Sequence, residues 1–330
     1  MTLSPSKSTL AFTPSALEID CAAEVDRIAA ALRRQLRFMR KRGLVLGLSG
    51  GIDSSVCAGL AARALGPGRV FGLLMPEHDS DPESARLGRL VAETFGIEAR
   101  IENIGPTLAA MGCYERRDAF IRDVVPDYGP GWACKIVLAN ALTTEGYNIS
   151  YLVVQAPDGT TQKLRMPPSA YLGIVAATNM KQRTRKQMEY FHADRLNHAV
   201  LGTPNRLEYD QGFFVKNGDG AADVKPIAHL YKSQVYQLAE YLGVPEEIRS
   251  RPPTTDTYSL AQTQEEFYFA LPYRQMDICL YGLENGLGAA DTATAASLTE
   301  EQVIRVWSDI ESKRKVARYL HLPPQLVEAI

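Results

Sequence analysis

A glycine-containing turn between two apolar segments limits the possible folds more than any other feature of this chain. Residues 44–48 are apolar, residues 49–55 read Ser-Gly-Gly-Ile-Asp-Ser-Ser, and an apolar helical pattern continues from 56 to 65. A buried strand that passes through glycines into a helix leaves unpaired backbone N–H groups at the helix start, where the helix dipole adds positive charge. The turn therefore predicts an anion site at the end of a strand in an α/β sheet.

The residues of this turn favour a nucleotide phosphate accompanied by a metal ion. Glycines let the backbone follow a phosphate closely, and hydroxyl groups add donors. Asp53 has the wrong charge for a phosphate, so we expect it to bind a bridging Mg²⁺. Neither a Walker A lysine nor the dinucleotide G-x-G-x-x-G spacing is present, and an ordinary strand-to-helix turn is the alternative. The predicted phosphate-binding residues are Ser49, Gly50, Gly51, Ser54 and Ser55.

The composition is that of a soluble folded protein. Of 330 residues, 45% are hydrophobic and 22% are charged, and the net charge of −2 gives no bulk reason to expect nucleic acid or an anionic membrane as a partner. No apolar run approaches the roughly 18 residues that span a bilayer, and residues 1–16 read as a flexible lead-in without a secretion signal. The five cysteines lack C-x-x-C spacing, which indicates reduced thiols and a cytoplasmic protein.

Strand and helix patterns alternate along the chain. Such alternation with short connections predicts an α/β fold with a doubly wound, mostly parallel sheet. The predicted elements are strands at 44–48, 69–75, 97–104 and 198–203, and helices at 17–42, 54–65, 82–95 and 174–197.

A second pattern interrupts this alternation. The turn sequence Ala-Pro-Asp-Gly at 156–159 lies between apolar segments at 151–154 and 162–166, which indicates an inserted β-hairpin. After a loop around Pro253 the chain is mainly helical. We therefore predict a single domain over residues 17–330, with an insertion at about 105–178.

Several motifs in a fixed order resemble those of one enzyme family. The 48–55 turn resembles the S-G-G-x-D-S loop of the ATP pyrophosphatases. Later motifs resemble those of the NAD synthetases within that superfamily, although Gln182, Pro204 and Arg206 depart from the family's residues and 105–178 does not align with it. These motifs are N-x-x-x-R-x-R at 179–185, the segment 202–208, G-F-F-x-K-x-G-D-G-x-x-D at 212–223, Lys232 at a helix start, and Pro-Thr-Thr-Asp at 253–256.

The resemblance implies a site for ATP, Mg²⁺ and a dinucleotide substrate. Asp53, Lys232 and Thr254 would act in catalysis, and Asp53 and Glu208 would ligate Mg²⁺. The residues implied to bind ATP are Ser49, Gly50, Gly51, Asp53, Ser54, Ser55, Thr203, Lys232 and Thr254. Those implied to bind the dinucleotide are Arg183, Lys216, Asp219 and Asp223.

The reaction implied by this resemblance is ammonia-dependent NAD⁺ synthesis in a homodimer. ATP would adenylate the carboxylate of deamido-NAD⁺ with release of pyrophosphate, and ammonia would then displace AMP. Because only about 43 residues precede the first predicted strand, we expect no glutaminase domain. Ammonia would be taken up free or received from a separate glutaminase.

Two other functions and several simpler residue roles remain open at this stage. The chain could be an ATP-dependent amide ligase for another carboxylate, or a non-catalytic nucleotide-binding relative. Glu208 could be a solvated loop carboxylate, and Asp219 could belong to a turn. Lys232 could be an ordinary lysine at the start of an amphipathic helix, and the basic residues in 181–186 could lie on an exposed helix face.

Overall fold

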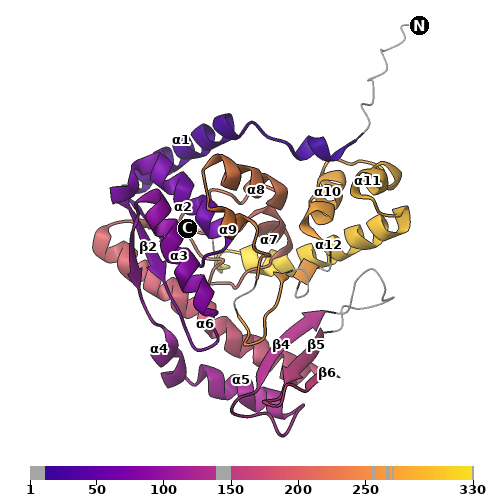
Figure 1. The fold of residues 1–330 in the computed structure, drawn as a ribbon. Coiled ribbons are helices and arrows are strands. Elements are labelled where there is room, and N and C mark those ends of the chain that lie inside the picture. Colours follow the sequence, from indigo (N-terminus) through magenta and orange to yellow (C-terminus); the bar gives the residue numbers. More distant parts are fainter. Residues whose placement is uncertain (1–11, 139–149, 255–256, 265–267, 270, 329–330) are drawn as a thin grey trace, which may run out of the picture.

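A four-stranded parallel sheet forms the centre of the molecule (Figure 1). The computed structural model describes residues 12–138, 150–254, 257–264, 268–269 and 271–328. The strand order is β3-β2-β1-β7, and all pairs are parallel, so the carboxyl ends of the strands meet at one edge. The predicted parallel sheet is confirmed, with shorter strands than expected: β1 (Leu44–Gly47), β2 (Val70–Leu74), β3 (Glu98–Ile101) and β7 (Ala199–Val200).

Helices cover both faces of this sheet. Side chains alternate along a strand, so Leu44 and Leu46 belong to the core on one face and Val45 to the core on the other. Burial on both faces explains why the strand sequences are almost continuously apolar. The first core includes α1 (Cys21–Met39), α2 (Ile52–Leu65), α3 (Pro82–Phe95) and α8 (Lys232–Tyr241), and the second includes α6 (Pro168–Leu196).

Local sequence signals explain where the helices begin and end. Asp20 precedes α1, and its Oδ1 accepts a hydrogen bond from Ala23 N at 3.0 Å. Asp81 caps α3, which has Pro82 at its first position and ends at Gly96 in a left-handed conformation with φ of 66°. These signals lie within a few residues of each boundary, so the predicted helix at 82–95 is confirmed.

The inserted segment contains a second, antiparallel sheet. The predicted hairpin is confirmed as β5 and β6, with Gln155 paired with Thr161 next to the turn. A third strand and two helices were not predicted, and α6 begins at Pro168 rather than at 174. Residues 139–149, between β4 and β5, lie outside the described residues. The elements are α4 (Gly105–Ala110), α5 (Cys113–Arg122), β4 (Ala133–Leu138), β5 (Ser150–Gln155) and β6 (Thr161–Arg165), with strand order β4-β5-β6.

The C-terminal part is helical, as predicted, and packs with the first described residues. The ring of Phe12 stacks on Tyr281 at a centroid distance of 5.4 Å, and Leu17 is buried in the same core. Most of the predicted lead-in, residues 1–11, lies outside the described residues, and the single-domain organisation stays a prediction. Within the described residues, no helix has the length and apolarity needed to cross a membrane. The remaining elements are η1 (Pro14–Leu17), η2 (Pro67–Arg69), α7 (Arg206–Gln211), α9 (Glu246–Arg249), α10 (Tyr273–Glu284), α11 (Ala289–Ala296) and α12 (Glu300–His321).

Candidate active site

The glycine turn joins β1 directly to α2. Its two glycines, Gly50 and Gly51, differ in backbone conformation and in what surrounds them. Gly50 has φ of 75°, and a Cβ there would lie 2.7 Å from Leu87 Cβ and 2.8 Å from the carbonyl oxygen of Ser84 in α3. Gly51 has an ordinary φ of −85°, and a Cβ there would meet only Ser49 Oγ, at 3.3 Å. The fold therefore requires glycine at 50, whereas at 51 the absent side chain leaves backbone exposed to a ligand.

The serines of the turn have separate roles. The hydroxyls of Ser54 and Ser55 donate to the carbonyl oxygen of Gly51 at 2.9 and 2.8 Å. Ser49 Oγ lies 3.1 Å from Ser54 Oγ, and Ser49 is exposed on the turn. No side chain caps α2 at its N-cap, Gly51. An incoming anion could therefore take hydrogen bonds from the first turn of α2 and from Ser49.

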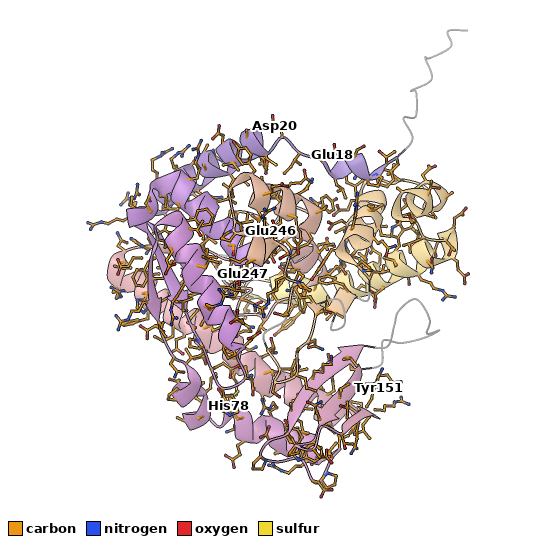
Figure 2. The ribbon with its side chains drawn as sticks, in the orientation of Figure 1. Glu18, Asp20, His78, Tyr151, Glu246 and Glu247 are labelled. Atoms are coloured by element: carbon orange, nitrogen blue, oxygen red, sulfur yellow. The ribbon has the colours of Figure 1, made fainter. Side chains whose placement is uncertain are left out.

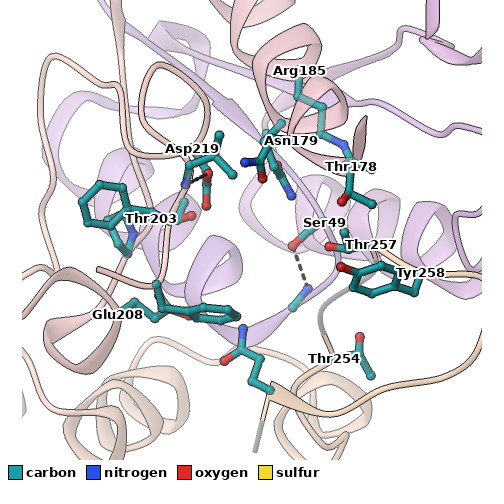
Figure 3. A pocket seen from close by; sticks show the side chains of 18 of the residues that line it. Ser49, Thr178, Asn179, Arg185, Thr203, Glu208, Asp219, Thr254, Thr257 and Tyr258 are labelled. Carbon is teal, nitrogen blue, oxygen red and sulfur yellow. Dashed lines mark hydrogen bonds between the residues drawn. The ribbon is translucent and has the colours of Figure 1, made fainter. Parts of the chain in front are cut away.

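A cavity of about 1310 Å³ lies at the carboxyl ends of the strands (Figure 3). Since pockets for one small ligand usually measure about 300–1,000 Å³, this cavity has room for two. Its lining includes Ile136, Ser150 and Arg165 of the inserted sheet. The predicted site residues that line it are Ser49, Gly50, Gly51, Asp53, Ser54, Arg183, Thr203, Glu208, Lys216, Asp219 and Thr254.

Asp53, Lys232 and Asn205 meet at one side of this cavity. Lys232 is the first residue of α8 and is completely buried, and its Nζ forms an ion pair with Asp53 Oδ2. Asn205 Nδ2 donates to Asp53 Oδ1 at 3.2 Å. Lys232 is not among the described residues that line the cavity. Its ammonium therefore neutralises Asp53 without lining the cavity itself.

Glu208 is connected to Asp53 and Lys232 through Asn205, the residue that caps α7. Asn205 caps α7, and Glu208 Oε2 accepts a hydrogen bond from Asn205 N at 3.1 Å in a capping box. Glu208 is buried in α7, so its description as a solvated loop carboxylate is wrong. Lys232 is completely buried, unlike an ordinary lysine of an amphipathic helix.

The charges at this centre suit a divalent cation. Burial, and then the neighbouring Asp53, raises the pKa of Glu208 to about 8. Burial acts to lower the pKa of Lys232, but Asp53 and Glu208 outweigh it, so that this pKa is raised. A hard cation with oxygen ligands would relieve the repulsion between the two carboxylates. The described residues contain no group of three or more His, Cys, Asp or Glu side chains placed to hold a metal ion.

Of the residues predicted to bind the dinucleotide, Arg183, Lys216 and Asp219 line the cavity and Asp223 does not. Arg183 Nε donates to the carbonyl oxygen of Lys216 at 3.2 Å, and Lys216 Nζ donates to backbone oxygens at the end of α12. Asp219 Oδ1 accepts from Val215 N at 2.8 Å, so it also shapes its own turn. Asp223 accepts from Val200 N at 2.7 Å and, like Ser55, is absent from the lining among the described residues.

A buried charge cluster beside the cavity was not predicted. Lys181 is completely buried, and its Nζ donates to Glu77 Oε1 at 3.0 Å and to Asp79. Glu77 and Asp79 flank His78 in the loop after β2, and His78 is labelled in Figure 2. Lys181 therefore does not lie on an exposed helix face, whereas Arg183 of the same run is exposed. The sequence signal that could have revealed this cluster is the pair of carboxylates after a predicted strand. The signal that could have revealed Asn205 is the N-x-x-E capping pattern.

Comparison with known proteins identifies the family. The sequence model of the family described as NAD synthase matches residues 24–124 and 138–318. The chain belongs to the NAD synthase family. It is 74% identical over 330 residues to the NH(3)-dependent NAD(+) synthetase of Rhizobium meliloti (strain 1021), covering 100% of this chain and 99% of that protein. The NH(3)-dependent NAD(+) synthetase of Thermotoga maritima is 33% identical over 267 residues, covering 81% and 89%.

Solved structures share the fold of this NAD synthase family member. The NMN synthetase of Francisella tularensis superposes with a TM-score of 0.64 at 22% identity, over 94% of this chain and 99% of that one. The NH3-dependent NAD synthetase of Campylobacter jejuni superposes with a TM-score of 0.60, also at 22% identity, over 94% and 100%. At this identity the likeness establishes the fold alone.

Proposed function

We propose that the chain is an ammonia-dependent NAD⁺ synthetase that adenylates the carboxylate of deamido-NAD⁺. The observation that carries this proposal is the 74% identity, over the full length of both chains, to a protein described as an NH(3)-dependent NAD(+) synthetase. The geometry supports it, because the glycine turn, Asp53 and Glu208 line one cavity large enough for two ligands.

The proposed reaction has two substitution steps. A carboxylate oxygen of the acceptor attacks the α-phosphorus of ATP, and the bond to the departing pyrophosphate breaks. Ammonia then attacks the carboxyl carbon of the adenylate, so that the amide forms, AMP leaves and a proton is released. Both steps need reactants held close together and developing negative charge held by fixed donors. No protein nucleophile is needed.

The ATP end of the cavity would provide those donors. The first turn of α2 and the hydroxyl of Ser49 would hold the pyrophosphate, and Thr254 and Thr203 would contact the phosphates. Asp53 and Glu208 would ligate Mg²⁺, which would neutralise phosphate charge when bound. Lys232 would act through Asp53, because its Nζ is paired with that carboxylate.

The acceptor end would lie against α6 and the 212–219 loop. Arg183 and Lys216 supply positive charge there, and Asp219 supplies a carboxylate for a hydroxyl or amide of the dinucleotide. Asp223 would also contribute, although it accepts a hydrogen bond from Val200 N and does not line the cavity among the described residues. We also propose a homodimer formed through α6, on which Leu172 and Phe191 are 63% and 57% exposed.

The proposal also includes the cellular location of the protein and the source of the ammonia that it uses. All five cysteines are free thiols, which supports a cytoplasmic protein. Ammonia would enter from solution or from a separate glutaminase. The fold leaves the acceptor open, because a neighbour of the same fold is named an NMN synthetase. The alternative is therefore amidation of another carboxylate, such as a nicotinate mononucleotide.

One assay tests the proposed function. The purified protein is incubated with Mg²⁺-ATP, ammonium and either deamido-NAD⁺ or nicotinate mononucleotide, and the products are followed by mass spectrometry. Equal amounts of NAD⁺, AMP and pyrophosphate with deamido-NAD⁺ are expected. Turnover with the mononucleotide alone would favour the alternative acceptor, and ATP binding without pyrophosphate release would favour a non-catalytic relative.

A further inference from the structure

A loop after α9 forms one wall of the cavity. We call residues 252–254 and 257–264 the pocket loop. Its base is closed by an antiparallel bridge between Thr254 and Thr263 and by a hydrogen bond from Gln264 N to the carbonyl oxygen of Pro253 at 3.2 Å. Thr254, Thr257 and Tyr258 line the cavity from this loop (Figure 3). Whatever holds the pocket loop therefore sets the position of that wall.

The pocket loop is bound to the inserted sheet along β4. Because β4 is an edge strand, its outer N–H and C=O groups are available to pair with another segment. The pocket loop pairs with them through both its backbone and its side chains. The contacts are Leu260 N to Cys134 O at 3.1 Å, Cys134 N to Ser259 Oγ at 2.9 Å, Lys135 Nζ to Ala261 O at 3.1 Å, and Gln262 Nε2 to Ile136 O.

Two buried side chains add to this attachment. Tyr258 is only 6% exposed and belongs to the core of the inserted segment, with Ile136 and Leu152. Lys181 donates from Nζ to the carbonyl oxygen of Thr257 at 2.8 Å while it is also held by the buried carboxylates after β2. The pocket loop is thus fixed between the inserted sheet and the main sheet.

We propose that the inserted sheet is a positioning element, which holds the pocket loop where Thr254 and Thr257 face the cavity. The NAD synthase family model leaves residues 125–137 unmatched, and these include most of β4. The β4 side of the attachment therefore lies mostly outside the part of the chain that the family model matches. The kinetic part of this inference rests on the proposed function, in which Thr254 meets ATP.

The proposal makes a specific kinetic prediction. If ATP binds only when the pocket loop is docked, a weaker attachment lowers the docked fraction and raises the apparent KM for ATP. At saturating ATP the loop is docked again, so kcat stays unchanged. Loss of general stability would instead lower the amount of active enzyme without this separation of KM from kcat.

The test compares two glutamines that each donate to a backbone carbonyl. Gln262→Met removes the donor to Ile136 and keeps the side-chain length, whereas Gln275→Met removes a donor to Ala296 O at 3.1 Å, away from the cavity. Gln262→Met should speed hydrogen exchange of the amides of 257–263 by about threefold or more and raise KM for ATP, because it removes at least the hydrogen bond to Ile136. Gln275→Met should leave the exchange of these amides and the KM for ATP at the wild-type level.

A second variant, Ser259→Ala, keeps the proposal testable if Gln262→Met does not fold. Ser259 is exposed, so Ser259→Ala should fold normally and change exchange and KM in the same direction, by less. Wild-type exchange and KM in both variants would overturn the proposal, as would equal effects in Gln275→Met. The exchange measurement needs no substrate, so it tests the attachment even if the wild type turns over neither acceptor and the proposed function itself fails.

Discussion

Asp53 joins the parts of the site at the scale of single residues, because it contacts both Lys232 and Asn205. Asp53→Asn keeps the side-chain size and an oxygen acceptor for Lys232, so we expect a folded protein of lower stability, because buried Lys232 loses its charged partner. The loss of the charge that would ligate Mg²⁺ should lower turnover by roughly a hundredfold or more. AMP release and thermal unfolding measure the two effects, with exposed Asp26→Asn in α1 as the control. Wild-type turnover would remove Asp53 from the metal site.

Asp79 gives a prediction about pH at the same scale. Burial acts to raise its pKa, but Lys181 and Arg117 outweigh burial and hold the pKa below its ordinary value of 3.8. Because the folded-state pKa is lowered, the stabilisation is complete above about 3.8 and is lost as the pH falls through the folded-state value. Asp79→Asn should lower the free energy of unfolding by about 3–5 kcal/mol at pH 7.

Denaturant titrations of wild type and Asp79→Asn at pH 7 and at about pH 3 measure this dependence. The difference between the two proteins should become smaller at the lower pH, because the unfolded wild type then binds a proton at Asp79 that the ion-paired folded carboxylate resists. A difference that stays constant would show that the charge of Asp79 contributes nothing, and that the variant acts through packing.

At the scale of elements, the turn between β1 and α2 predicts opposite effects for neighbouring glycines. Gly50→Ala forces a side chain into a positive φ and against α3, which should cost about 1–3 kcal/mol of stability. Gly51→Ala has an ordinary φ, and its Cβ would meet only the side-chain end of Ser49, with Oγ at 3.3 Å, so stability should hold while KM for ATP rises. Thermal unfolding and ATP kinetics separate the two. Unchanged ATP kinetics in Gly51→Ala would mean that no phosphate approaches the backbone there.

At the scale of the whole molecule, the exposed apolar side chains of α6 predict self-association. Phe191 is 57% exposed on α6, and Phe38 is 89% exposed on α1. Phe191→Asp should weaken a dimer by about 2 kcal/mol or more, as burial of a charge at an interface does. Sedimentation velocity at micromolar concentration should show dimers for wild type and for Phe38→Asp, and monomers for Phe191→Asp. A monomeric wild type would contradict the proposed dimer.

The sequence by itself determined the elements that depend on neighbouring residues. Alternating strand and helix patterns with short connections predicted the parallel sheet and the helix at 82–95, and the turn at 156–159 predicted the hairpin. The glycine turn also predicted where a ligand would bind, because a strand end and a helix start lie together within eight residues. These signals are local, so one sequence can carry them.

Only the tertiary structure decided which distant groups meet. It paired Lys232 with Asp53, placed Glu208 in a capping box, and turned Asp223 toward Val200. The strand β4 was not predicted because one of its two partners, the pocket loop, lies far along the chain, with Ser259 separated from Cys134 by 125 positions. A sequence pattern records the burial of a residue but does not name its partner, since contacts between distant segments depend on how the whole chain packs.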